Sequence, residues 1–82
     1  MPLVTLTVRK PKSSAFKSTM LNAVHAALVS AGVPAPDKFQ RVIELEAEDF
    51  RFDPTYPDVK TERNEDFDLV EILWSVGVFH AA

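Results

Sequence analysis

The chain has 82 residues, which is enough for one small domain spanning 1–82 and not for two. Hydrophobic residues make up 46% of it and cysteine is absent, which excludes disulfides and thiolate metal sites as supports for so small a core. His25 and His80 lack ligand-like spacing, so no metal site is expected. Association with further copies is the remaining support, and we expect a homo-oligomer.

The net charge of −3 is unevenly distributed along the chain. Six basic residues and one acidic residue occur through Arg41, whereas three basic and eleven acidic residues follow it. The split is typical of two solvated faces that orient subunits, or of a first half that lines a site for small anions. Overall acidity argues against a nucleic-acid partner. Without a membrane-spanning run or a targeting signal, we expect a soluble, cytoplasmic protein with no membrane partner.

The first half of the chain predicts a strand followed by a helix. Apolar and polar residues alternate over residues 3–8, which indicates a β-strand that starts at the chain terminus. Ser13 or Ser14 then offers an N-cap, and apolar residues recur every four positions from Phe16 to Leu28. This periodicity predicts a helix over residues 14–31 whose stripe belongs to the core. Gly32 and the prolines that follow it predict the helix end.

The second half predicts two further strands separated by an irregular connection. Residues 39–47 alternate with Arg41, Ile43 and Leu45 on one face, and residues 67–76 alternate in the same way. Residues 49–66 are polar, but Phe50, Phe52 and Tyr56 are expected to pack. Residues 77–82 form a short tail. The order predicts an α+β fold in which a βαβ unit plus a third strand forms two layers, helix on sheet, completed by oligomerisation.

Pro2 is the first candidate for chemistry. An initiator methionine before proline is ordinarily removable, and its removal exposes a secondary amine held at a strand end. An α-amino group titrates at about 7.7–8.0, and nearby cations or an apolar pocket lower that value further. Such a base can take and return a proton in one turnover. The alternative is a Met-Pro start with no catalytic role.

Several segments in order resemble the tautomerase superfamily, in its 4-oxalocrotonate tautomerase-like and malonate semialdehyde decarboxylase-like members. Residues 2–8 resemble the opening Pro-apolar strand, and residues 12–17 the basic residue and Ser-rich helix start that follow. Residues 21–28 and 32–40 are similar to the decarboxylase branch, and residues 41–43 to the tautomerase branch. The resemblance covers about residues 2–53, and residues 67–76 match a third strand.

The resemblance implies roles for residues at matching positions. Pro2 is the catalytic amine, and Arg41 polarises a carbonyl or binds a carboxylate. Lys12 takes the place of a carboxylate-binding arginine, although lysine lacks the bidentate fork. Further positions match an aspartate that activates water, a cation of dehalogenase members and an aromatic residue of the pocket wall; these are Asp37, Arg9 and Phe52.

Each of these residues also has a structural interpretation. Lys12 and Arg9 are typical of solvated charges near a helix start, and Arg41 of a structural salt bridge. Asp37 suits a turn, and Phe52 suits a core.

The expected function is tautomerisation of a small 2-hydroxy or 2-oxo acid by an isomerase-type enzyme that needs no cofactor. Pro2 moves the proton, while Arg41 and Lys12 hold carboxylates. One alternative is a decarboxylase or hydrolytic dehalogenase of a 3-carbon acid, with Asp37 assisting water. The other is a catalytically inactive chain that only oligomerises. The resemblance implies a trimer or hexamer and a chain truncated after its third strand, because longer members carry a second βαβ unit.

Overall fold

The computed structural model describes residues 1–57 and 61–74 of the chain. Strand β1 (Pro2–Arg9) is the central strand and begins at the second residue, in agreement with the predicted start at the chain terminus. Its even-numbered side chains make the core, because Val4, Leu6 and Val8 are at most 2% exposed. The alternation in the sequence therefore identifies correctly the face of β1 that is buried deepest.

Helix α1 (Ser14–Ser30) follows β1 after a short turn. Ser13 is the N-cap, since its Oγ accepts a hydrogen bond of 3.0 Å from the Phe16 N–H. Past the helix end, Gly32 has a φ of +110°, a conformation that favours glycine. The predicted apolar stripe is half-buried, and none of the α1 residues is fully buried. One helix on a small sheet leaves its flanks open to solvent.

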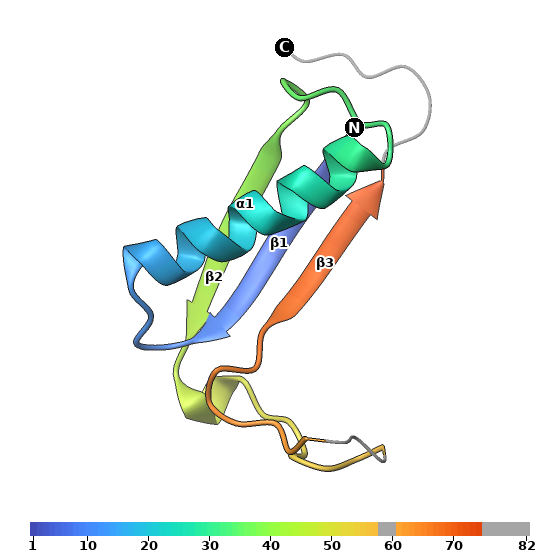
Figure 1. The fold of residues 1–82 in the computed structure, drawn as a ribbon. Coiled ribbons are helices and arrows are strands. Elements are labelled where there is room, and N and C mark those ends of the chain that lie inside the picture. The colour runs from blue at the N-terminus through green and yellow to red at the C-terminus, as the bar shows by residue number, and fades with distance from the viewer. Residues whose placement is uncertain (58–60, 75–82) are drawn as a thin grey trace.

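Strands β2 (Phe39–Leu45) and β3 (Leu69–Trp74) flank β1 in a sheet of order β2-β1-β3. The β1–β2 pair is parallel and the β1–β3 pair is antiparallel, which confirms the predicted βαβ unit with a third strand. Helix α1 lies across one face of this sheet (Figure 1). Strand β3 begins two residues after the predicted start at residue 67, and the predicted end of the strand (75–76) and the tail (77–82) lie outside the described residues.

Polar contacts fasten α1 to β2. The Gln40 amide donates a hydrogen bond of 2.8 Å to the Leu21 carbonyl, and Lys17 Nζ lies 2.6 Å from Glu44 Oε1. Gln40 and Glu44 have the same parity on β2 and therefore project from the same face. These contacts identify the even-numbered face of β2 as the one under α1.

The connection between β2 and β3 includes a short 3₁₀ helix (Ala47–Asp49) and a cluster of three aromatic rings. Phe50, Phe52 and Phe67 have ring centroids 4.7 to 6.3 Å apart. The prediction that Phe50 and Phe52 pack is confirmed. The prediction for Tyr56 is wrong, because its side chain is 76% exposed. Its backbone N–H instead donates to Asp53 Oδ1 at 2.7 Å, in a local turn that turns the ring away from the cluster.

No described element covers the face of the sheet opposite α1 (Figure 1). We call this the open face, and its side chains are odd-numbered on every strand. Where all three strands pair, they are Leu3, Thr5 and Thr7 of β1, Phe39, Arg41 and Ile43 of β2, and Leu69, Glu71 and Leu73 of β3.

Candidate functional site

Pro2 lies at one end of the sheet, which we call the Pro2 end. Its side chain is less than 2% exposed, and its cross-strand partner is Trp74, which is 53% exposed. The ring shares the α1 face of the sheet with the core residues of β1. Strand pairing and burial together hold the start of the chain in one place, as the alternation predicts.

Asp37 lies at the same end of the sheet. Because β1 and β2 are parallel and Leu3 faces Phe39, the residues just before Phe39 lie beside the first residues of β1. The loop is fixed by its backbone: the Asp37 N–H donates to the Pro34 carbonyl at 2.9 Å. Asp37 is half-buried, so a carboxylate lies near the start of β1 and keeps contact with solvent.

In this structure Met1 is joined to Pro2, which makes the Pro2 nitrogen a tertiary amide. A tertiary amide has no basic lone pair, and its nitrogen carries no hydrogen to donate. Acid–base work by Pro2 therefore depends on removal of Met1. Once freed, the amine starts a strand whose following residues are held by two neighbours.

Arg9 and Phe52 meet at the opposite end of β1, which we call the Arg9 end. The Arg9 guanidinium lies 4.2 Å from the centroid of the Phe52 ring, and its Nε donates a hydrogen bond of 2.8 Å to the Phe50 carbonyl. This cation–π contact ties the β2–β3 connection to the end of β1. Both residues therefore make structural contacts within their own chain.

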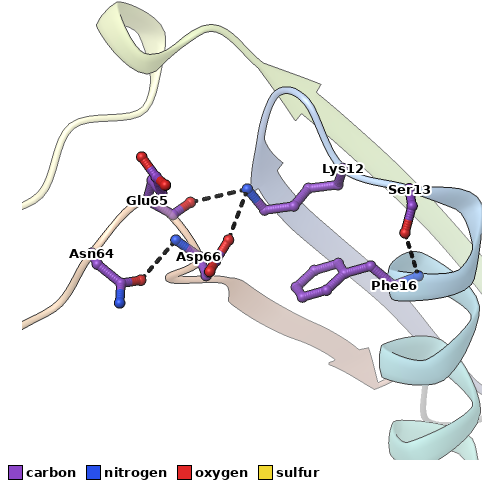
Figure 2. Close-up of polar contacts among 6 residues, drawn as sticks. All are labelled: Lys12, Ser13, Phe16, Asn64, Glu65 and Asp66. Atoms are coloured by element: carbon purple, nitrogen blue, oxygen red, sulfur yellow. Dashed lines mark hydrogen bonds and ion pairs between the residues drawn. The ribbon is translucent and has the colours of Figure 1, made fainter.

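Lys12 is held at the same end by the β2–β3 connection (Figure 2). Its ammonium donates to the Glu65 carbonyl at 3.1 Å and lies 3.3 Å from Asp66 Oδ1, and its side chain is only 8% exposed. Its Nζ also lies over the Phe16 ring, 5.9 Å from the ring centroid. A substrate carboxylate would have to displace Asp66 to reach this ammonium.

Arg41 projects from the open face, on the opposite side of the sheet from the Pro2 ring. Its Nε donates a hydrogen bond of 2.7 Å to Thr5 Oγ1, and Glu71 lies beyond Thr5 in the same cross-strand row. Among the described residues no ion pair joins Arg41 to a carboxylate. The hydroxyl of Thr5 is its partner in this structure.

One chain therefore separates the six predicted site residues into three places. Pro2 and Asp37 lie at the Pro2 end, and Arg41 lies on the open face. The eight residues of β1 span about 23 Å at ~3.3 Å per residue, which separates the Pro2 end from the Arg9 end. Small acids are much shorter than this distance, so a cation of the Arg9 end reaches Pro2 only from another copy.

Two further residues lie at the Pro2 end and are not among the six site residues predicted from the sequence. Lys38 directly follows Asp37 and is the basic residue nearest in register to Pro2, and Trp74 adds a half-exposed aromatic surface. The sequence signal for Lys38 is its place immediately before a parallel strand. The signal for Trp74 exists only once the antiparallel register of β3 is known.

Three carboxyl groups have shifted pKa values. The Lys17 hydrogen bond lowers the pKa of Glu44, and the backbone N–H groups of Thr55 and Tyr56 lower that of Asp53. Burial raises the pKa of Asp68, whose Oδ1 has no hydrogen-bond partner among the described residues. Glu44 pairs with Val8 near the Arg9 end, and Asp53 and Asp68 lie in the β2–β3 connection, so they bear on stability and not on chemistry at the Pro2 end.

Over the described ranges 1–57 and 61–74, no enclosed pocket is found, and no three histidine or acidic side chains converge as a metal site. Within the same ranges, no helix is both long and apolar enough to cross a membrane. Compared with models of protein families, with curated proteins and with solved structures, the chain matches none at a significant level. The structural observations that bear on function are therefore the arrangement of the Pro2 end and the uncovered surfaces of the sheet.

Proposed function

We propose that the chain is a cofactor-independent isomerase of tautomerase type, acting on a small 2-hydroxy or 2-oxo acid through the amine of Pro2. The observation that supports this most is the placement of Pro2. It is the first residue of the central strand, it is almost fully buried, and a carboxylate and a cation lie at the same end of the sheet.

The proposed reaction is a proton shift with no net change in composition. The free amine of Pro2 takes the proton of the 2-hydroxyl group, electrons move through the diene, and the resulting ammonium returns the proton to carbon. A cation beside the substrate stabilises the negative charge that develops on oxygen. An apolar wall favours the neutral amine, because desolvation disfavours its charged form.

We propose Lys38 as the cation that this chain itself brings to the substrate carboxylate, since it lies at the Pro2 end and is exposed. Of the cations expected from the sequence, Lys12 acts at Pro2 in this proposal only from a neighbouring copy, and Arg41 lies on the opposite side of the sheet from the Pro2 ring. The lack of an enclosed pocket within the described ranges also favours a site completed by association, in the expected trimer or hexamer.

The test begins with the intact mass, which must show loss of Met1. The purified protein is then assayed with a 2-hydroxydienoate and with phenylenolpyruvate. We expect Pro2→Ala to lower kcat/KM at least about 100-fold, because an acid–base catalyst of this kind contributes 10²- to 10⁴-fold. Pro54→Ala is the matched control, since Pro54 is exposed on the β2–β3 connection. Equal rates for wild type and Pro2→Ala would overturn the proposal and favour the catalytically inactive alternative.

A second candidate is decarboxylation or hydrolytic dehalogenation of a 3-carbon acid. It is favoured by the position of Asp37, which the parallel β1–β2 register brings to the Pro2 end. Here the protonated amine polarises the substrate carbonyl and Asp37 assists water. Asp37→Asn separates the two functions, because it abolishes the second activity and leaves tautomerisation intact.

A further inference from the structure

The open face combines apolar side chains with one charged row. Leu3 lies between Phe39 and Leu73, and Thr7 lies between Ile43 and Leu69, so two apolar rows flank the row centred on Thr5. The four long apolar side chains of the outer strands are 39 to 69% exposed; they are Phe39, Ile43, Leu69 and Leu73. Exposed apolar side chains gathered on one face mark an interaction surface.

The central row carries opposite charges on opposite edges. Arg41 lies on β2 and Glu71 on β3, and both face Thr5 of β1. Adjacent strands are about 4.8 Å apart, so the two backbones are about 10 Å apart across the sheet. Arg41 bonds to Thr5 through Nε, which leaves the two terminal nitrogens of the guanidinium directed at no carboxylate of the described ranges. Glu71 likewise makes no ion pair there.

We propose that the open face binds the open face of a second copy of this chain, about a two-fold axis parallel to β1. This rotation exchanges the two edges of the sheet and keeps every residue at its height along the strands. The β2 strand of each copy then lies over the β3 strand of its partner. Arg41 of one copy faces the Glu71 carboxylate of the other, and the symmetry repeats this ion pair.

Charge selects this axis over the other two-fold axis that can pair the same faces. An axis across the strands places β2 over β2, so that Arg41 meets Arg41 and Glu71 meets Glu71. Like charges opposed across an interface are strongly unfavourable. About the chosen axis, each row of the open face also lies opposite the same row of the second copy. The two apolar rows therefore meet apolar rows, and the charged row meets an identical row with its positive and negative ends exchanged.

The dimensions of the face set the strength of the dimer. Three strands and about seven residues give a contact of about 14 by 23 Å, and packed sheets lie ~10 Å apart. This is smaller than the standard interface of about 800 Å² per partner, so we expect a dissociation constant in the micromolar range. The interface does not rest on the proposed catalysis, and a two-fold pair is a building unit of the expected hexamer but not of a trimer alone. It gives Arg41 a structural role in the face-to-face pair.

The test is sedimentation of the full chain from about 1 to 500 μM, a range that brackets micromolar affinity. Arg41→Glu leaves both charged positions of a copy acidic, and Glu71→Arg leaves both basic. Each variant alone is expected to dimerise at least about 10-fold more weakly than wild type, because two attractive pairs become two repulsive ones. An equimolar mixture of the two variants is expected to recover the wild-type affinity as a heterodimer.

Controls for the charge changes are Lys38→Glu and Glu48→Arg, which alter exposed residues outside the open face by the same amount. Recovery in the mixture also shows that both variants are folded. Three results would each overturn the proposal: a monomeric wild type throughout the range, a dimer unaffected by either single variant, or a mixture no tighter than its parts. A dimer that neither single variant weakens would instead indicate that two copies pair through the edge strand β3 or about the other two-fold axis.

Discussion

At the scale of single residues, the Lys17–Glu44 ion pair makes stability depend on pH. The Lys17 hydrogen bond lowers the pKa of Glu44 from its ordinary 4.5, so the folded state favours the ionised carboxylate. Its stabilising effect is therefore complete above pH 4.5 and is lost as the pH falls through the lower folded value. We expect Glu44→Gln to lower Tm by a few degrees at pH 7 and to match wild type at an acid pH below the lowered pKa of the folded state, as followed by circular dichroism.

Glu48→Gln is the control for this pair, since Glu48 is exposed and its carboxylate makes no ion pair with any residue of 1–57 or 61–74. It should leave Tm unchanged at both pH values. If Glu44→Gln is as stable as wild type at pH 7, the ion pair with Lys17 adds no net stability over hydration of the carboxylate.

Residue-scale predictions from the sequence succeed where the contact is local and stop where it depends on register. Ser13 can be identified as a cap because its partner, the Phe16 N–H, lies three residues away. The contact of Arg41 with Thr5 spans 36 positions and exists only in the parallel register of β1 and β2. The salt bridge considered for Arg41 requires a carboxylate within its own chain, and strand pairing places a hydroxyl there instead. The catalytic role of Pro2 stays a prediction.

At the scale of elements, helix α1 depends on its N-cap. None of the residues in its first turn is acidic, and no α1 residue is fully buried, so other sources of helix stability are weak. Loss of the Ser13 hydroxyl leaves the Phe16 N–H without its acceptor. We expect Ser13→Ala to destabilise the protein by about 1 kcal/mol, which is a fall in Tm of about 4–8 °C. Thermal melts monitored at 222 nm, the helix signal, measure it.

Ser14→Ala is the matched control, because Ser14 is the first helical residue and its hydroxyl makes no hydrogen bond to the described residues. Its melting temperature should equal that of wild type or exceed it slightly, since alanine favours helix. Equal losses in the two variants would assign the effect to helix propensity and not to the cap.

The helix and all three strands can be predicted from periodicity, because apolar residues recur every four positions along α1 and alternate along the strands, although every residue of β3 is exposed. The sequence also predicts that β1 and β2 are parallel, since a helix of this length connects them. It does not predict the β2–β3 connection in detail. Phe52 packs on Arg9, 43 residues earlier by sequence number, whereas Tyr56 is largely exposed. Aromatic composition alone cannot distinguish the two residues, because the difference lies in a turn around Asp53.

At the scale of the whole molecule, three parts are held with unequal strength: the core between α1 and β1, the β2–β3 connection and the open face. The apolar side chains of the even-numbered face of β1 are the most deeply buried ones of the described ranges, and α1 covers them; on the opposite face Thr5 and Thr7 of the same strand are also buried. The β2–β3 connection is fastened at the Arg9 end through rings and cations and not through strand pairing. The open face is left to association. We expect such a molecule to unfold in steps, with the β2–β3 connection opening locally before the sheet unfolds.

Phe52 is the residue on which attachment of the connection depends most, because it touches Arg9, Phe50 and Phe67. We expect Phe52→Ala to cost about 1–2 kcal/mol, as fits a half-buried ring in an aromatic cluster. Limited proteolysis should then cut within residues 46–68 at least about 5-fold faster, because local opening follows that free energy. Tyr56→Ala removes an exposed ring from the same segment and should change neither rate nor Tm. If both variants are cut at the wild-type rate, the attachment rests instead on Lys12 and its contacts with Glu65 and Asp66.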